Sequence, residues 1–589
     1  MNRQVKTALS VIAFVLVSLF LIYWRIPRDV STSREAVKTA FVLSAFMFLL
    51  SAPCFYVIFR MLFGEYLGVV FSVLYVLLAV FPYKLFYGGE VALGNICFER
   101  VPTTIFGASG VWVVVFYFAV SLLGASVYWF YKKGKLFPVI EKGRALIFLL
   151  LFLAVLIQVL PRLGERSPKA VRRDRHRPAA ERSYPYRTQV FYGVETGGAD
   201  VWHHVGPSGM FRGNFGVARR VVINRRGFAP YLYSLISTYF HPYDAGIIVN
   251  AVFYYMIVVC GYLLAKQLNL DESIAIAYSV LLSANYFILN WTLEPVFYIQ
   301  FFAFTILILF LIPRLGVFEN SCKVKDKVLF YFVLACGGLT YDPFMFSGIL
   351  LLWGFFHSVK VLSTSVKKSL GTFARAMVYA AIPVFSQYVW EVLLRCYDLQ
   401  GMVDNIQARA NLCSKLLSLP KYMYSNFWEF GALVSRNIIR LVVENPVLPV
   451  KDLLDPSAHP TALTGEGPIE YWSVLGLLGV FSFFVLLPRY VNKEYREGLY
   501  ACYISNLGIA LMSSLAAAIG PLMKYHWIFL TPGRTNNAYP VLVLAQSIGI
   551  YHITKLCCDK FGIEKRVQII VVIVAACIYM LSFVKLLFL

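Results

Sequence analysis

Apolar stretches of about 20 residues follow one another along most of this chain, and few charged side chains interrupt them. A bilayer core about 30 Å thick needs roughly 20 apolar residues in a helix to cross it. Backbone polar groups in hydrocarbon must bond internally, so each run predicts a membrane-spanning helix. Of the 589 residues, 59% are apolar and only 14% are charged, against ~25% charged in soluble proteins. This excludes a soluble globular, a disordered or a disulfide-stapled secreted protein.

We therefore expect an all-α, polytopic membrane protein with about fifteen transmembrane helices. The first run follows Met1 to Lys6 and lacks a small-residue cleavage site, so it predicts a span rather than a signal peptide. Tyr341, Asp342 and Pro343 divide one long apolar stretch into two spans. The predicted spans are 7–24, 36–60, 66–83, 110–131, 145–161, 245–265, 273–290, 296–313, 327–341, 343–360, 373–394, 471–488, 498–519, 537–554 and 567–588.

The distribution of Lys and Arg between short loops predicts the orientation. The net charge of +23 is largely explained by the basic residues that multi-span proteins keep on the cytoplasmic side. With a cytoplasmic N-terminus, dense basic clusters fall at 132–144, 314–327, 360–368 and 555–566 on that side. The same topology makes 84–109, 162–244, 395–470 and 520–536 external, and we expect a multi-pass protein of a bacterial inner membrane.

The first long external segment is the part of the chain that the orientation bias does not explain. Residues 162–227 hold fourteen Arg or Lys and five Asp or Glu, a net charge of +9. The stretch up to Arg187 resembles a linker, whereas 190–227 is rich in glycine and aromatic residues. The residues that follow, Phe228 to Phe240, predict an amphipathic helix lying at the membrane surface.

Carboxylates expected at the external face are the candidate catalytic groups. Asp200 follows a Gly-Gly pair and stands close to His203 and His204, so it is a candidate base, with Glu195 as a second. A solvated carboxylate in an Asx turn is the alternative reading. Glu294 and Asp342 stand at external helix ends, where helix capping is the commoner role. His203 is a candidate substrate-binding residue.

Basic residues at the external face are the candidate binding groups for an anionic substrate. Arg225 and Arg226 precede the predicted surface helix, and Lys524, His526 and Arg534 lie in the last external loop. Arg suits bidentate recognition of phosphate. Contact with lipid headgroups, or a solvated surface, is the alternative.

The cysteine spacing and the common catalytic motifs do not indicate a function. The eleven cysteines form no CxxC and no Cys/His cluster, although Cys396 and Cys413 could pair in one external loop. No HExxH, P-loop, GxSxG or EF-hand pattern occurs. Because these patterns are absent, the sequence gives no support for a metalloprotease, an ATPase or a serine hydrolase.

The arrangement resembles the GT-C superfamily of integral-membrane glycosyltransferases, which includes protein O-mannosyltransferases and lipid A aminoarabinose transferases. A span is followed by an external loop with an acidic residue, Asp200, and then by GFAPYLY at 227–233. A train of spans with short turns follows, including GGLTYDP at 337–343. Near the C-terminus, 532–540 resembles the external Arg/Tyr/Pro segment of these enzymes. The resemblance covers roughly 145–556 and implies a GT-C-like core.

The resemblance implies the transfer of a sugar from a polyprenyl-phosphate donor to a lipid, glycan or protein acceptor at the external face. Asp200 would be the base, while Arg534 and Lys524 would face the donor phosphate. It leaves a divalent metal requirement open, because Asp200 is followed by Val201 rather than a second acid. The core would span 135–589, with external loops 162–244 and 395–470, after an N-terminal four-helix module at 1–134.

Two other classes of protein fit parts of the pattern. An O-antigen-type polymerase or ligase would use the loop 395–470, and a transporter or flippase would move a lipid-linked or anionic solute. Transporters commonly contain internal repeats and mid-span ionisable residues, and neither is evident in this sequence. Positive charge divided between both membrane sides argues against nucleic acid as a partner.

Overall fold

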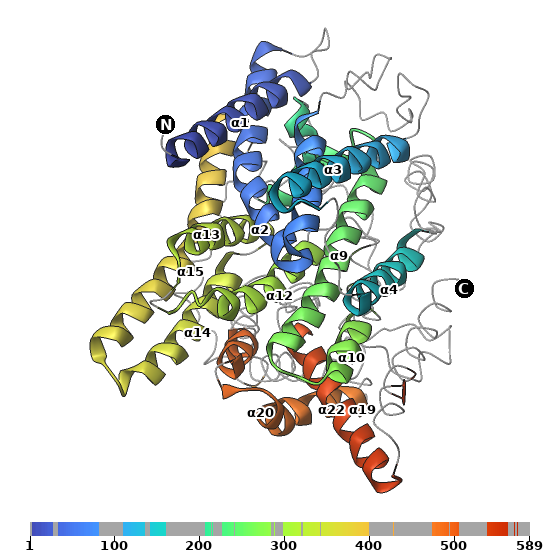
Figure 1. The fold of residues 1–589 in the computed structure, drawn as a ribbon. Helices are drawn as coiled ribbons and strands as arrows, with labels where there is room; N and C mark the ends of the chain where they lie inside the picture. Colours follow the sequence, from blue (N-terminus) through green and yellow to red (C-terminus); the bar gives the residue numbers. More distant parts are fainter. Residues whose placement is uncertain are drawn as a thin grey trace.

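The computed structural model places part of the chain, and every described segment with regular structure is helical (Figure 1). The structure describes residues 3–26, 33–81, 110–135, 142–160, 206–213, 215, 226–240, 242–283, 288, 292, 298–319, 322–341, 343–399, 428, 474–493, 495–505, 539–562, 570–571 and 574. Within these residues, seven helices are long and apolar enough to cross a membrane. The all-α prediction is confirmed for the described part, and several long apolar helices indicate a membrane protein.

While the total of about fifteen spans stays a prediction, most helices of the described part overlap predicted apolar runs. They are α1 (Arg3–Arg25), α2 (Arg34–Val80), α3 (Gly110–Lys133), α4 (Lys142–Val159), η4 (Gly206–Arg212), α8 (Phe228–Ile236), α9 (Pro242–Gln267), α10 (Glu272–Ser283), α12 (Tyr298–Leu315), α13 (Val324–Gly338), α14 (Pro343–Leu362), α15 (Val366–Cys396), α19 (Val474–Phe481), the π-helical turn η8 (Ser482–Leu486), α20 (Leu487–Tyr490) and α22 (Tyr539–Lys560).

Helix α2 is a helical hairpin of two antiparallel legs. Gly64 has φ 84° and ψ 179°, a conformation outside the helical region that glycine adopts readily. Across it, the rings of Phe59 and Phe71 lie 5.6 Å apart, and those of Phe55 and Tyr75 lie 4.7 Å apart. The two legs correspond to the separate spans predicted at 36–60 and 66–83.

Polar side chains fix where several helices begin. Ser33 accepts a hydrogen bond from the backbone nitrogen of Ala36 at 3.1 Å and so caps α2. Ser365 caps α15 in the same way through Lys368. The carboxylate of Asp271 accepts from the nitrogen of Ser273 at the start of α10. These bonds satisfy backbone donors that have no partner within their own helix.

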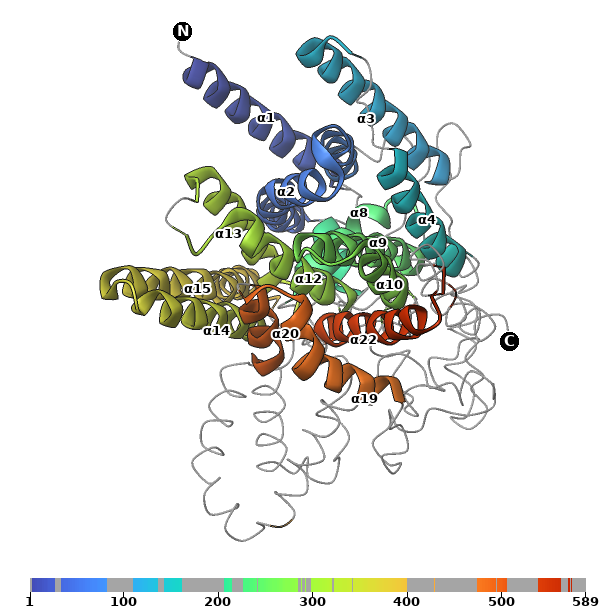
Figure 2. The ribbon, with the colours of Figure 1, turned by 60° about the horizontal axis from the view of Figure 1, so that its bottom comes forward.

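The core lies around α9 and α12, with other helices at the margins. Of the most apolar window of each helix, 78% is buried in α12 and 72% in α9, but only 28% in α3. Figure 2 shows α1 and α3 at one margin and the pair α14 and α15 projecting at another. Apolar side chains stay exposed on α1, α3 and α4, as expected for helices that face lipid. Residues of α2 and α9 share one apolar core, so part of the predicted module 1–134 packs into the predicted core 135–589.

The two ends of the helix bundle differ, and we name them by their residues. The α8 end contains α8, the first turns of α9 and α12, and the last residues of α1 and α2. The Gly64 end contains Gly64, the last turns of α9 and α12 and the start of α4. The predicted topology makes the α8 end external and the Gly64 end cytoplasmic.

Candidate functional site

Helix α8 lies inside the protein, and its residues from Phe228 to Leu235 are all buried. The predicted helix over Phe228 to Phe240 is wrong in length, since α8 ends at Ile236, and it packs against protein rather than lying exposed. Its position at the membrane surface stays a prediction. Apart from Ser234, the residues of α8 are apolar or aromatic, which favours burial. The buried hydroxyl of Tyr233 has a hydrogen-bond partner inside the protein, because it donates to Oδ1 of Asn250 at 3.0 Å.

Arg25, the last residue of α1, holds the C-terminal end of α8. Its Nη2 donates to the carbonyl of Leu235 at 3.3 Å and to Oγ1 of Thr238 at 2.8 Å. Its Nη1 donates to the carbonyl of Ala79, near the end of α2, at 2.9 Å. The last carbonyls of a helix have no intrahelical partner and carry the negative end of its dipole, so a guanidinium there is stabilising.

Arg212 reaches the same point from a different segment. It ends η4, and its Nη2 donates to the carbonyl of Ser234 at 2.6 Å and to Oγ1 of Thr238 at 2.7 Å. Two guanidinium groups thus share the hydroxyl of Thr238. The residues 206–213 belong to the predicted external loop 162–244, and this contact anchors them to the α8 end of the bundle.

Arg226 is the one predicted site residue within the described part of the chain. Its guanidinium carbon lies 4.4 Å from the centre of the Tyr341 ring, a cation–π contact. Beside it, the backbone nitrogen of Phe228 donates to the carbonyl of Leu339 at 3.3 Å. The end of the first long loop is therefore attached to the turn that leads directly into Asp342.

Gly227 permits the close packing of this segment. A Cβ built there would lie 2.3 Å from Cε of Met47 and 2.5 Å from the ring of Trp390. The Trp390 ring in turn stacks on Phe211, 6.1 Å between centroids with 12° between the planes, and on Phe46 at 5.9 Å. A side chain at position 227 would push α2, α15 and the loop apart.

Glu391 is a buried carboxylate next to this packed aromatic cluster. It follows Trp390 on α15 and is 7% exposed. Its Oε1 accepts a hydrogen bond from Nε2 of Gln387 at 3.2 Å. An ionisable group inside a membrane-length helix is costly to bury and often functional. Glu391 lies in the last two turns of α15, which ends at Cys396. This part of α15 is at the α8 end of the bundle.

A pair of buried polar side chains, Asn250 and Gln300, lies next to α8. Asn250 and Gln300 are both fully buried, and Nε2 of Gln300 donates to Oδ1 of Asn250 at 3.4 Å. With Tyr233, these residues connect α8, α9 and α12 by side-chain hydrogen bonds. These bonds link the three helices, although the buried Oε1 of Gln300 has no hydrogen-bond partner among the described residues.

The other predicted site residues lie outside the described residues. They are Asp200, Glu195, His203, Arg225, Glu294, Asp342, Lys524, His526 and Arg534. Their roles remain predictions from the sequence. Within the described part, no group of three or more His, Cys, Asp or Glu side chains could hold a metal ion.

Arg25, Thr238 and Glu391 were not among the predicted site residues. In the sequence, Arg25 is a charge at the end of the first predicted span. Its partner Thr238 is 213 residues away, so the sequence gives no sign of their contact. Glu391 carried a local signal, because it is a carboxylate within an apolar run and near Trp390. Arg212 is one of the fourteen basic residues of 162–227, and nothing local in the sequence indicates its contact with Thr238.

No protein-family model matches this chain, and no curated protein matches it.

Proposed function

We propose that this protein is a membrane glycosyltransferase that transfers a sugar from a polyprenyl-phosphate donor to an acceptor at the external face. Asp200 removes the proton from an acceptor hydroxyl, and the acceptor oxygen bonds to the anomeric carbon. The bond from that carbon to the phosphate oxygen breaks, and polyprenyl phosphate departs. General-base catalysis and cations beside the leaving phosphate would both lower the barrier.

The observation that carries the proposal is the attachment of Arg226 and Phe228 to the turn at 339–341. The loop with Asp200 ends at this attachment, and Asp342 follows the turn in the sequence. Arg226 is thereby held at the α8 end of the bundle, and in the sequence Asp200 precedes it in the same loop. Arg25 and Arg212 add positive charge there, although both are engaged with α8.

Glu391 extends the candidate site. The ring of Trp390 packs against Gly227. Arg226 precedes Gly227 and Glu391 follows Trp390, so the two charged residues belong to neighbouring parts of the structure. We include Glu391 as a second candidate acid, alongside Glu195, Glu294 and Asp342. Its burial would give it the low-dielectric surroundings in which a carboxylate interacts strongly with a nearby cation.

The test uses the full chain in proteoliposomes with synthetic polyprenyl-phosphate-linked hexoses and pentoses. Release of polyprenyl phosphate is followed by mass spectrometry, with a membrane extract as the acceptor source. Asp200→Asn should abolish release, whereas Glu35→Gln, which removes an exposed carboxylate at the same end of the bundle, should not. Full activity of Asp200→Asn would remove Asp200 from the mechanism.

A transporter or flippase is the second candidate function. The buried pair Asn250 and Gln300 favours it, because polar side chains inside a helical bundle can line a solute path. Movement of a labelled polyprenyl-phosphate sugar across the proteoliposome membrane, without any released polyprenyl phosphate, would support the transporter and contradict the glycosyltransferase.

A further inference from the structure

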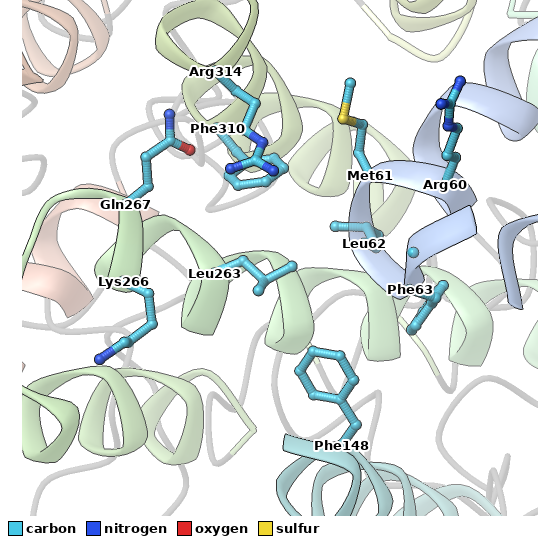
Figure 3. A pocket seen from close by; sticks show the side chains of 11 residues that line it. Arg60, Met61, Leu62, Phe63, Phe148, Leu263, Lys266, Gln267, Phe310 and Arg314 are labelled. Carbon is cyan, nitrogen blue, oxygen red and sulfur yellow. The ribbon is translucent and has the colours of Figure 1, made fainter. Parts of the chain in front are cut away.

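A pocket of about 370 Å³ opens at the Gly64 end of the bundle, opposite α8 (Figure 3). Its walls come from the turn of the α2 hairpin, the start of α4 and the last turns of α9 and α12. None of the residues proposed for catalysis lines it. The pocket is therefore a separate feature, and its interpretation does not depend on the proposed reaction.

Three basic side chains from three helices line the pocket. They are Arg60 of α2, Lys266 of α9 and Arg314 of α12, and no acidic residue lines it with them. Lys266 has a partner, because its Nζ lies 2.6 Å from Oε2 of Glu272. Among the described residues, neither Arg60 nor Arg314 forms an ion pair. The pocket thus presents an excess of positive charge.

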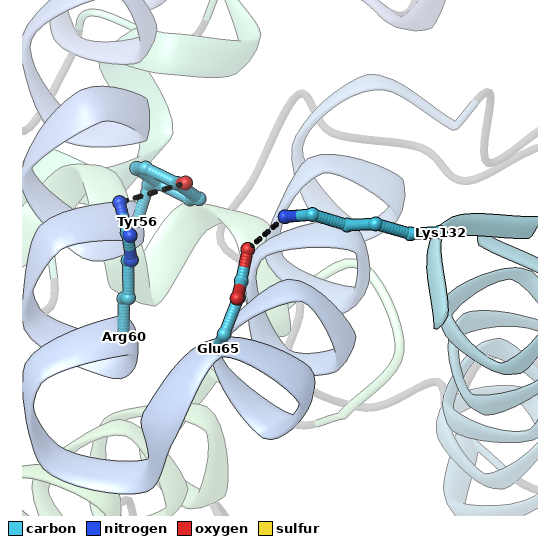
Figure 4. A network of polar contacts seen from close by, with 4 residues as sticks. All are labelled: Tyr56, Arg60, Glu65 and Lys132. Carbon is cyan, nitrogen blue, oxygen red and sulfur yellow. Dashed lines mark hydrogen bonds and ion pairs between the residues drawn. The ribbon is translucent and has the colours of Figure 1, made fainter. Parts of the chain in front are cut away.

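Arg60 has no direct ion-pair partner among the described residues, although its charge acts on Glu65 at longer range. Figure 4 shows Arg60 donating to the hydroxyl of Tyr56, 3.5 Å away, while the neighbouring Glu65 pairs with Lys132 of α3. The tyrosine hydroxyl is neutral, and the closest carboxylate on the hairpin turn already has its own cation. A phosphate group would supply the negative charge that Arg60 lacks.

The backbone around the pocket is held in place by specific contacts. Gly64 turns the chain with φ +84°, and Gly68 allows the second leg to approach the backbone of Arg60. In the amide orientation that satisfies both groups, Gln267 donates to the carbonyl of Phe310 at 3.2 Å and accepts from the nitrogen of Arg314 at 3.0 Å. These bonds join the ends of α9 and α12, so the basic residues stand on fixed helix ends.

The rest of the lining is apolar, which restricts the kind of ligand. The apolar side chains are Met61, Leu62, Phe63, Phe148, Leu263 and Phe310. A fully polar anion would leave these groups without partners. A phosphate ester with a hydrocarbon chain would satisfy both parts of the lining. Basic pockets between membrane helices on the cytoplasmic side bind anionic lipid headgroups in this way.

We propose that this pocket binds the phosphate headgroup of an anionic phospholipid from the cytoplasmic leaflet. Arg60 and Arg314 contact the phosphate, Lys266 contributes with Glu272 as its partner, and the first part of an acyl chain lies against Phe148 and Leu263. The bound lipid would hold the α2 hairpin against α9 and α12.

The test measures lipid bound to the purified full chain by native mass spectrometry. The protein is released from nanodiscs of phosphatidylglycerol, cardiolipin or phosphatidylcholine. We expect retained phosphatidylglycerol or cardiolipin, no retained phosphatidylcholine, and a loss of at least about tenfold in Arg60→Gln/Arg314→Gln. Arg60→Lys/Arg314→Lys keeps both charges and should retain most of the lipid, which separates lost binding from lost folding.

The matched control is Lys323→Gln/Lys367→Gln, which removes two exposed charges from the same end of the bundle, outside the pocket lining. An equal loss of lipid in this control would overturn the proposal, since it would show a general charge effect. Equal retention of phosphatidylcholine would overturn it as well. Thermal stabilisation by inorganic phosphate, without retained lipid, would assign the pocket to a free phosphate instead.

Discussion

Arg226 and Tyr341 lie 115 positions apart in the sequence, yet the guanidinium carbon of one is 4.4 Å from the ring centre of the other. The contact stands beside the bond from the Phe228 nitrogen to the Leu339 carbonyl. Together they attach the start of α8 to the turn between α13 and α14. This attachment gives Arg226 a defined position, which a charge on a free loop would not have.

Loss of the Arg226 charge should reduce sugar transfer more than loss of its stacking partner. If Arg226 stabilises the departing phosphate, Arg226→Ala should lower turnover by about 100-fold. Tyr341→Leu removes the cation–π contact with Arg226, about 1 kcal/mol, so turnover should fall by about fivefold. It also removes the ring contacts with Tyr298 and Phe301, so turnover is compared per folded protein. Release of polyprenyl phosphate is the measurement.

Arg34→Gln removes an exposed charge at the α8 end and is the control for Arg226. It should leave turnover unchanged. Normal turnover in Arg226→Ala would exclude Arg226 from the donor site and leave it with a purely structural contact.

Arg25 and Arg212 should each be coupled to Thr238 in stability measurements. Each donates to Thr238 Oγ1, at 2.8 and 2.7 Å, and a hydrogen bond to a charged group contributes about 1.5–3 kcal/mol. Arg25→Ala should therefore lower the thermal unfolding midpoint in detergent clearly. In Thr238→Val, the further loss caused by Arg25→Ala should be smaller. Additive losses would show that the shared hydroxyl is unimportant.

Alanine at Gly227 should destabilise the protein strongly. The new Cβ would lie 2.3–2.5 Å from Met47 and Trp390, and overpacking typically costs about 1–3 kcal/mol or more. Gly124→Ala in α3 is the matched control, because its Cβ would meet nothing within 4 Å and alanine favours a helix by about 1 kcal/mol. Unfolding in detergent compares the two. Equal midpoints would contradict the packing at Gly227.

Cysteine labelling should report the orientation of the chain. Cys396 at the end of α15 and Cys557 on α22 are both exposed, and the charge pattern assigns them to opposite sides. A membrane-impermeant maleimide should label Cys396 in intact cells and Cys557 only after permeabilisation, as read by peptide mass spectrometry. Buried Cys260 and Cys502 should react only after denaturation. The reverse pattern would invert the topology and contradict the proposed external reaction.

The ion pair at the start of α10 should give a small, acid-sensitive contribution to stability. Burial of Glu272 disfavours its charge, but hydrogen bonds from Lys266 and Tyr262 outweigh this and lower the pKa of the carboxyl. A lowered folded pKa gives stability that is present above the unfolded pKa and is lost as the pH falls through the folded pKa.

Glu272→Gln should therefore lower the free energy of unfolding slightly at pH 7. The loss should be less than about 1 kcal/mol, because solvent screens the ion pair. The difference from the unchanged protein should shrink as the pH falls below about 4.5. Lys266→Met should produce a similar pH profile. A difference that grows in acid would contradict the assignment.

Much of the helical layout could be predicted from local sequence. The interruption at Tyr341, Asp342 and Pro343 predicted two spans, and α13 and α14 lie on either side of it. Two spans are likewise predicted at 36–60 and 66–83, and the chain reverses at Gly64 between them. Such breaks depend on neighbouring residues, so periodicity and turn chemistry suffice.

The interior position of α8 could not be predicted in the same way. Its tyrosines suggested a surface helix, but Tyr233 finds its hydrogen-bond partner in Asn250 of the next helix. Arg25 likewise bonds to Ala79 of α2 and to Thr238, far away in the chain. Contacts between distant segments decide whether a polar group is exposed or satisfied internally, and one sequence does not contain that information.

The tight reversal at Gly64 also bears on how the polypeptide enters the bilayer during synthesis. Its two legs are joined without any hydrophilic connector long enough to remain in water while one leg waits for the other. We therefore expect both legs to be inserted as a single unit, with the first leg gaining its antiparallel neighbour as soon as the second emerges from the ribosome.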